Sequence, residues 1–422
     1  MEEYVNAAKE LIECIKSTTS APLACGYFKE YFRQKGFRKL DCDKEFGRLQ
    51  PGKYYTDLYG NTVVAFTIPE NITRELRIVS AHTDSPALCI KPVPEIKSED
   101  AVKFNVEVYG GPILNTWLDR PLGISGRVAL RSNIPGQFNE RLVDFKKPML
   151  TIPNLAIHMN RDVNKGMELN RQTDMLPLAA IFGDISLNKM LAQELDVEEQ
   201  EILDYDLYIY NCEDGCLLGQ FEDMISAPRL DNITSSYAAA KAVTEADGNT
   251  GINMTVLFDN EEIGSRTKQG AGSNAVEYLL RRIYGSIGID NVELAVSSGK
   301  MLSVDVAHAA HPNHGEKGDV TNKVALGRGV VIKKSCSQGY ATDCRMAAYV
   351  KELCESALIP CQMYVNRSDI QGGSTLGSIM SSMLPMYTAD IGVPVLAMHS
   401  ARETMGTRDQ LYLEKLLRRF FE

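Results

Sequence analysis

Two short clusters of ionisable residues have the types and spacing needed for metal-assisted chemistry. His82 and Asp84 form His-Thr-Asp at the end of an apolar run, where strand geometry would point both side chains to the same side. One residue could then bind a metal ion while the carboxylate accepts the other imidazole N–H and fixes the tautomer. Alone, the tripeptide is weak evidence for a metal site, because it is more typical of a turn or of a hydrogen-bonded core histidine.

The second cluster is the adjacent pair Glu261 and Glu262, which follows the apolar run MTVLF. Two neighbouring carboxylates repel each other unless a cation lies nearby or one of them is protonated. With a metal present, one could act as a ligand, while the other takes a proton from an activated water and passes it to a leaving amine. A solvated acidic loop is the alternative interpretation.

Three more residues end or interrupt apolar runs in the same way. Asp231 precedes a helical run in PRLDNIT, where a helix N-cap is the simpler explanation. Asp305 lies inside SVDVAHA, where burying a carboxylate is costly without a cation or donors. His399 ends VPVLAMHS and could be a core histidine. Together with His82 and the glutamates, these residues suit a hydrolytic site with two metal ions and one bridging carboxylate.

The elements that must position these residues are apolar runs that alternate with helical patterns. Continuous apolar runs are typical of buried, largely parallel strands, and amphipathic patterns begin near Asp231 and Asn274. We therefore expect an α/β fold with a mixed, mainly parallel sheet flanked by helices. In such sheets, ligands bind beyond the carboxyl ends of the strands, where the polar clusters fall. The four runs are 76–86, 253–265, 301–309 and 393–403.

The segment 91–223 differs from the rest of the chain. It has short alternating runs, such as KFNVEVYG and DYDLYIYN, separated by Gly, Pro and Asn turns, which indicates a strand-rich region. We expect a discontinuous catalytic domain made of residues 1–90 and 224–422, with an inserted β-rich second domain at 91–223.

Composition narrows the range of partners. The net charge of −10 argues against binding to nucleic acid or anionic membranes. The start of the chain is acidic and helical, unlike a signal peptide, and the uncharged stretch 370–389 contains many Gly, Ser and Thr residues. Ten scattered cysteines fit a reducing cytoplasm. Cys212 and Cys216 could form half of a metal site, but no second pair matches their spacing, so free thiols are favoured.

Five motifs together resemble the aspartyl aminopeptidase family of dizinc exopeptidases, in order and in approximate spacing. They are AHTDSP, PRLDN, DNEEIGS, SVDVAHA and AMHSARE. The resemblance covers the whole chain and implies a dizinc exopeptidase fold. It also implies a cis peptide bond after Asp231. The implied roles are His82 and Asp305 on one metal, Glu262 and His399 on the other, Asp231 as the bridge, Glu261 as general base and Asp84 orienting His82.

The resemblance assigns two further residues. His158, in NLAIHMNR, would reach the active site of a neighbouring subunit and help to hold the substrate carbonyl; from the sequence alone it is only a histidine beside an apolar run. Lys333, or its neighbour Lys334, would supply a cation for an acidic substrate side chain, although some family members prefer neutral residues. Relatives form tetrahedral dodecamers built from dimers through the inserted domain, and we expect the same homo-oligomer here.

The resulting hypothesis is an aminopeptidase that removes N-terminal residues from peptides with two Zn²⁺ ions, for which Co²⁺ or Mn²⁺ could substitute. A preference for Asp or Glu is left open against a neutral preference. One alternative is a dizinc deacylase or carboxypeptidase that uses the same ligands. Another is a non-catalytic assembly protein that has kept only the fold.

Overall fold

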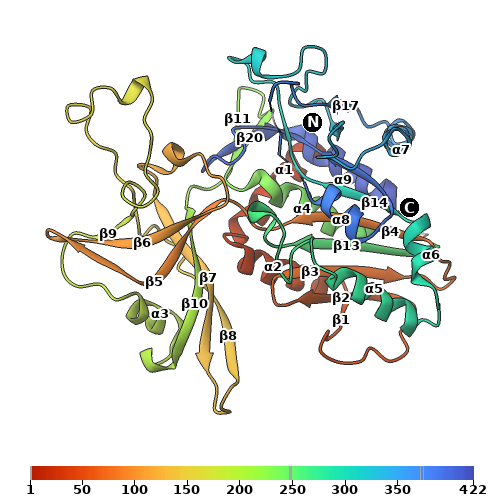
Figure 1. The fold of residues 1–422 in the computed structure, drawn as a ribbon, viewed down its shortest axis with the longest axis horizontal. Coiled ribbons are helices and arrows are strands. Elements are labelled where there is room, and N and C mark those ends of the chain that lie inside the picture. The colour runs from red at the N-terminus through yellow and green to blue at the C-terminus, as the bar shows by residue number, and fades with distance from the viewer. Residues whose placement is uncertain (1, 247–249, 371, 374) are drawn as a thin grey trace.

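The computed structural model describes residues 2–246, 250–370, 372–373 and 375–422. Its two main parts lie side by side: a large sheet covered by helices, and a smaller sheet accompanied by one helix (Figure 1). Among the described residues, no helix is long and apolar enough to cross a membrane. The helices are α1 (Glu2–Ser17), α2 (Ala21–Gln34), α3 (Leu187–Leu195), α4 (Leu230–Glu245), α5 (Ala275–Ser286), α6 (Val292–Ser298), α7 (Cys344–Ser356), α8 (Leu376–Met383) and α9 (Thr407–Phe421).

The large sheet is mixed and mainly parallel, which confirms the predicted α/β fold class. The neighbouring strands β13, β4, β14 and β18 all run parallel, while β2, β3 and β16 introduce antiparallel pairs. In spatial order its strands are β1 (Arg38–Lys39), β2 (Gly52–Leu58), β3 (Thr62–Ile68), β13 (Ile252–Phe258), β4 (Leu76–His82), β14 (Lys300–Val304), β18 (Tyr387–Gly392), β16 (Val330–Lys333) and β17 (Cys361–Tyr364).

Two hydrophobic cores cover the two faces of this sheet. Strand residues alternate between them: Val64 and Phe66 face the core formed with α5, α6 and α8, whereas Val63 and Ala65 face the core formed with α1, α2, α4, α7 and α9. Because both faces are buried, the strands read as continuous apolar runs in the sequence. Helix α4 carries the small residues 238–240 and packs against β4 and α9.

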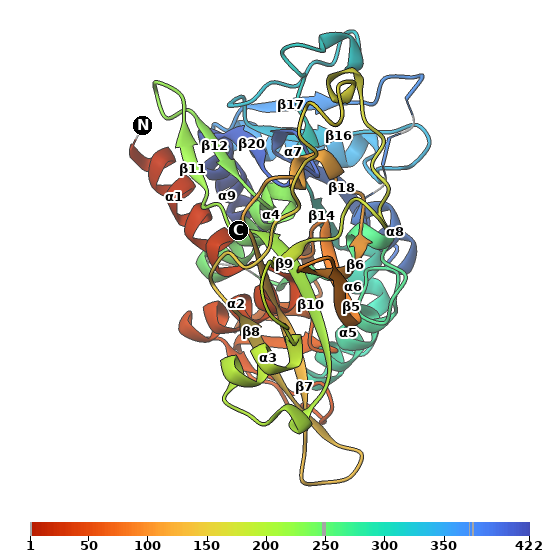
Figure 2. The ribbon, with the colours of Figure 1, turned by 90° about the vertical axis from the view of Figure 1, so that its left-hand side faces the viewer.

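A second sheet and a small third sheet complete the fold. The second sheet has α3 packed on it and faces the viewer in Figure 2. Its first strand along the chain, β5, starts at Ala87, soon after the His-Thr-Asp turn. Its strands are β8 (Phe138–Asp144), β7 (Leu122–Arg131), β10 (Ile202–Asn211), β5 (Ala87–Ser98), β6 (Ala101–Tyr109) and β9 (Leu178–Ala180). The third sheet consists of β11 (Cys216–Leu218), β12 (Met224–Ala227), β20 (Glu403–Gly406), β19 (Pro394–Leu396) and β15 (Ala307–His308).

The third sheet joins residues that precede α4 to residues near the C-terminus, because β12 pairs with β20. This pairing brings the segment before Asp231 next to the segment after His399. The free thiols of Cys212 and Cys216 lie at this junction and form no disulfide.

Candidate metal centre

Four of the candidate residues lie at one edge of the large sheet, at or just after the ends of three adjacent parallel strands. His82 is the last residue of β4, and its neighbour across the ladder is Phe258, the last residue of β13. Glu261 and Glu262 follow β13 almost at once, in a short 3₁₀ turn. On the other side of β4, strand β14 ends at Val304, so Asp305 is the next residue. These side chains meet because parallel strands share a carboxyl edge.

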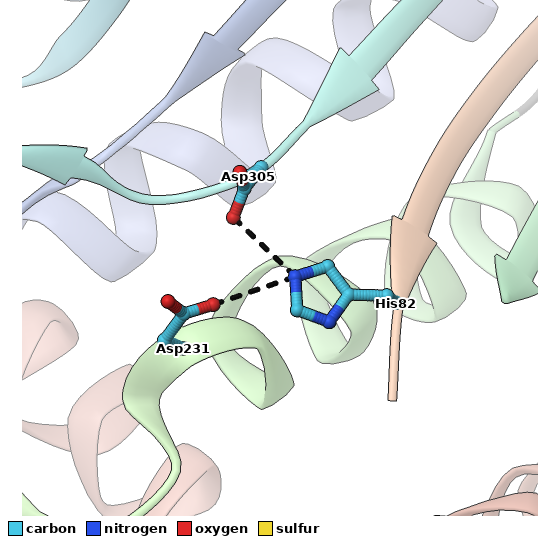
Figure 3. Close-up of side chains that lie close together, drawn as sticks. All are labelled: His82, Asp231 and Asp305. Carbon is cyan, nitrogen blue, oxygen red and sulfur yellow. Dashed lines mark ion pairs between the residues drawn. The ribbon is translucent and has the colours of Figure 1, made fainter. Parts of the chain in front are cut away.

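Asp231, at the start of α4, lies between the two histidines. One carboxylate oxygen, Oδ1, is 3.4 Å from His82 Nε2, and the other, Oδ2, is 3.4 Å from His399 Nε2. His82 Nε2 also lies 3.5 Å from Asp305 Oδ1, so this imidazole points between two carboxylates (Figure 3). The Asp231–Asn232 peptide bond is cis, as the resemblance implied.

Of the three donor groups found among the described residues, two have Asp231 in common. In each group the ligand atoms lie within 4.8 Å of one another. Asp231 belongs to both groups, and each of its oxygens faces a different histidine, which is the arrangement that a bridging carboxylate requires. The groups are His82, Asp231 and Asp305, and Asp231, Glu262 and His399.

The buried oxygen atoms of the site are also suited to binding cations. Asp231 Oδ1 and Glu262 Oε1 are buried and have no hydrogen-bond partner, and buried polar atoms without partners are rare in folded proteins. A metal ion at each group would satisfy these oxygens. Imidazole and carboxylate donors suit zinc and also accept manganese or cobalt.

Both histidines are held so that Nε2 faces the carboxylates. His82 Nδ1 lies 3.1 Å from the backbone oxygen of Asp84 and 3.4 Å from its Oδ1. His399 Nδ1 lies 3.0 Å from the backbone oxygen of Gly111. With the proton on Nδ1 donated to these oxygens, Nε2 is left free as a metal donor.

Asp84 also organises the loop that carries the two glutamates. Its two oxygens accept hydrogen bonds from the backbone N–H groups of Glu261 and Glu262, each at 3.1 Å. The Tyr109 hydroxyl donates a further hydrogen bond of 2.8 Å. One buried carboxylate therefore contacts β4, β6 and the turn after β13.

Several acidic groups lie close together in the site, and this proximity shifts the pKa values of its residues. Burial, together with the charges of Asp305, Asp84 and Asp231, raises the pKa of Glu261 to about 8, against the opposing influence of His82. Burial alone would lower the pKa of His399, but Asp231 and Glu262 outweigh it and raise that pKa to about 10. Without cations the site therefore retains protons, which bound metal ions would displace.

Glu403, which the sequence did not single out, holds two of the candidate ligands. Its side chain is 1% exposed and accepts hydrogen bonds from the backbone N–H groups of Asp231, at 3.0 Å, and of His399, at 2.8 Å. The available signal was its place in AMHSARE, four residues after the histidine. Tyr109 was also missed, and nothing in its local sequence marks it.

The two remaining predicted residues lie outside the donor groups. Lys333 is fully buried, and its Nζ donates to Asp305 Oδ2 at 3.3 Å. His158 is exposed, in the long segment between β8 and β9. In Figure 1 this segment, coloured yellow, rises above β6 and β9 of the second sheet.

The sequence matches the protein family described as "Aminopeptidase I zinc metalloprotease (M18)" over residues 14–421. The chain belongs to the M18 aminopeptidase family. A "Probable M18 family aminopeptidase 2" from Clostridium novyi (strain NT) is 42% identical over 433 residues, with 100% of each chain covered. The sequence similarity to this family therefore extends along nearly the whole chain.

Solved structures of M18 proteins share this fold. The chain in "Cryo-EM structure of the Ape4 and Nbr1 complex" has a TM-score of 0.95 at 29% identity, covering 99% of this chain and 86% of that one. The "Structure of S. cerevesiae mApe1 dodecamer" has a TM-score of 0.87 at 24% identity, covering 99% of this chain and 97% of that one. The donor groups described above therefore lie in a fold that these solved structures share.

Proposed function

We propose that this M18 protein removes single N-terminal residues from peptides with two zinc-type ions, and that Glu261 acts as the general base. One observation carries the proposal: the two oxygens of Asp231 face two different histidine–carboxylate groups, and Glu261 lies beside them. Glu261 Oε2 is 4.0 Å from His82 Nε2 and belongs to a third group of potential donors with His82 and Glu262.

Two bound ions would supply Lewis-acid chemistry, polarising the peptide carbonyl and making a water molecule more acidic. His82 and Asp305 would hold one ion, Glu262 and His399 the other, and Asp231 both. Glu261 would accept the proton of the attacking water and pass it to the leaving amine. Without cations, burial and the neighbouring carboxylates raise the pKa of Glu261 to about 8, and bound ions would lower it, leaving the carboxylate free to accept a proton.

Asp84 would act by orientation. Its contacts with His82 Nδ1 and with the backbone of Glu261 and Glu262 support this role. A carboxylate in that position fixes the imidazole tautomer and raises the basicity of the ligand.

We also propose that the protein works as a homo-oligomer in a reducing cytoplasm. His158 would act in the site of a neighbouring subunit, which agrees with its exposed position in a segment that rises above the second sheet. Dimerisation would use the inserted domain, residues 91–223. A dodecamer is supported by the assembly named for one structural neighbour.

The test is an assay of amino-acyl anilides that differ in the N-terminal residue, with and without chelator and added zinc. We expect zinc-dependent release of the aniline. Glu261→Gln should lower kcat by about 10²–10⁴-fold, because the proton acceptor is removed, and it should still bind zinc. Glu262→Gln should instead lose zinc affinity. Glu277→Gln is the matched control and should behave as the unaltered protein, because Glu277 is a partly exposed residue of α5 that pairs with Arg281.

Other outcomes would support the alternatives. Turnover of N-acyl amino acids or of C-terminal residues, without release from anilides, would identify a deacylase or carboxypeptidase. Zinc binding without any turnover would indicate a non-catalytic assembly protein.

A further inference from the structure

Tyr109, the last residue of β6, joins the second sheet to the candidate metal centre. Its hydroxyl donates a hydrogen bond of 2.8 Å to Asp84 Oδ2 and accepts one of 3.0 Å from the side-chain amide of Asn260. Its ring packs edge-to-face against Tyr208 of β10, with the ring centroids 5.8 Å apart. The ring contact and the two hydrogen bonds together fix the position of the hydroxyl.

Asn260 connects this hydroxyl to the turn that carries the two glutamates. It immediately precedes Glu261 and has a left-handed backbone conformation, with a φ of 65°. Its side-chain oxygen accepts hydrogen bonds from Thr267 Oγ1, at 2.9 Å, and from Gln269 Nε2, at 2.8 Å. These contacts direct its amide nitrogen to Tyr109. The tyrosine hydroxyl thus lies between a buried carboxylate and the start of the glutamate turn.

Asp84 is the residue that links Tyr109 to the site. Asp84 is buried, and its Oδ2 accepts from the Glu262 N–H as well as from the tyrosine. Its Oδ1 accepts from the Glu261 N–H and lies 3.4 Å from His82 Nδ1. The two N–H groups belong to the turn that Asp84 supports, whereas the tyrosine hydroxyl belongs to another sheet. The hydroxyl can therefore anchor the carboxylate independently of that turn.

The two glycines that follow Tyr109 hold the same segment close to the second donor group. Gly110 has a φ of 71°, and a Cβ atom at this position would lie 3.2 Å from Glu262 Cβ. The backbone oxygen of Gly111 lies 3.0 Å from His399 Nδ1. Glycine permits both the left-handed conformation and so close an approach. This close fit limits movement of Tyr109 relative to the site.

We propose that Tyr109 is a positioning residue for the peptidase reaction: its hydroxyl orients Asp84, and Asp84 in turn holds His82 and the backbone of the glutamate turn. The second sheet thereby supports the metal centre from within the same chain. The inference rests on the proposed aminopeptidase function, which it deepens by naming a residue on which both metal binding and the placement of Glu261 depend.

The first experiment measures the zinc affinity of full-length, metal-free protein by competition with a chromogenic chelator. Tyr109→Phe removes the hydroxyl and keeps the ring against Tyr208, so the fold is retained. We expect its zinc affinity to fall by about 10–100-fold, as for other residues that orient metal ligands.

Tyr205→Phe is the matched control. Tyr205 lies in β10 and donates to the backbone oxygen of Lys91 at 3.0 Å, so its substitution removes a hydrogen bond of the second sheet that has no contact with the donor groups. Its zinc affinity should be unchanged. A zinc affinity of Tyr109→Phe equal to that of Tyr205→Phe would overturn the proposal.

A double-mutant cycle tests whether Tyr109 acts through Asp84. Asp84→Asn leaves one oxygen to accept hydrogen bonds that two oxygens accept now, and it should itself lower zinc affinity. In the Asp84→Asn protein, Tyr109→Phe should lower zinc affinity little further, because the two changes remove the same interaction. Equal losses with and without Asp84→Asn would show that the hydroxyl does not act through this carboxylate.

A kinetic comparison at saturating zinc separates positioning from substrate binding. With amino-acyl anilides, Tyr109→Phe should lower kcat by up to about 100-fold, because a small displacement of a catalytic group is costly, while KM stays close to that of the unaltered enzyme. A rise in KM with kcat unchanged would contradict the positioning of Glu261. If the unaltered protein hydrolyses no anilide, the proposed function fails, whereas the zinc cycle still decides whether Tyr109 positions Asp84.

Discussion

Glu403 contacts the backbones of two candidate ligands that come from different parts of the chain. Asp231 begins α4, whereas His399 follows β19, and one carboxylate receives the N–H group of each. Burial raises the pKa of Glu403 to about 8, with a further contribution from the charge of Asp231. This side chain therefore sets the separation of the bridging carboxylate and one histidine without itself belonging to either donor group.

The residue-scale prediction is that Glu403→Gln weakens zinc binding. Glutamine retains one oxygen acceptor, but its amide group cannot accept the second N–H, so either Asp231 or His399 loses its support. We expect zinc affinity to fall by about 10–100-fold, as for other residues that hold metal ligands, when measured by calorimetric titration of metal-free protein.

Glu414→Gln is the matched control for this experiment. Glu414 is also buried, but it pairs with Lys241 at 2.9 Å, away from the donor groups. Its substitution should lower thermal stability and leave zinc affinity unchanged. Equal zinc affinity in Glu403→Gln and Glu414→Gln would show that the backbone contacts do not position the ligands.

At the scale of single elements, the short connection between α7 and β17 brings two thiols together. Cys354, near the end of α7, is buried, and Cys361, the first residue of β17, is half-buried. A hydrogen bond from Cys354, assisted by Lys351, lowers the pKa of the Cys361 thiol from 9.0 to about 7, although burial acts in the opposite direction. Thiolates, not thiols, react with alkylating agents.

We therefore expect iodoacetamide to modify Cys361 with a midpoint near pH 7, slowly below that pH and rapidly above it. Cys354→Ala removes the donor and should move the midpoint to higher pH. Peptide mapping by mass spectrometry measures both, with Cys361→Ser as the blank. Cys14, whose pKa burial raises to about 12, should remain unmodified. A midpoint unaffected by Cys354→Ala would exclude the hydrogen bond as the cause.

Much of the secondary structure was predictable, because strands that are buried on both faces appear in the sequence as continuous apolar runs. The runs at 76–86, 253–265 and 301–309 became β4, β13 and β14, and the pattern after Asp231 became α4. The fourth run, 393–403, did not join the large sheet, because its short strand β19 pairs within the third sheet. The third sheet was not predicted, because its strands are only two to four residues long and therefore carry no periodicity.

At the scale of the whole molecule, the position of His158 bears on assembly. It lies in the exposed segment between β8 and β9, which also exposes the large apolar side chains Leu155, Ile157 and Met159. Contiguous exposed apolar residues are typical of interaction surfaces. This agrees with a role for the segment in contacts between subunits.

The corresponding prediction is complementation between two inactive variants. His158→Ala and Glu261→Gln should each be nearly inactive when assembled alone. Co-expressed with different affinity tags and purified through both, they should regain activity, because a site with Glu261 can receive an intact His158 from its neighbour. His314→Ala, another exposed histidine, should leave activity unchanged. Full activity of His158→Ala alone, or no recovery on co-assembly, would argue against a shared site.

The sequence by itself determined the fold class, the strand ends and the residue types of the candidate site, because apolar periodicity and ordered motifs are local properties of the chain. Only the tertiary structure decided which atoms face one another. In the structure, each oxygen of Asp231 lies near a different histidine. Glu403 accepts a hydrogen bond from the backbone N–H of Asp231, which is 172 positions away in the sequence. Lys333 donates a hydrogen bond to Asp305. Such contacts depend on how distant strands are paired and on which way buried side chains turn, and neither leaves a local pattern in the sequence.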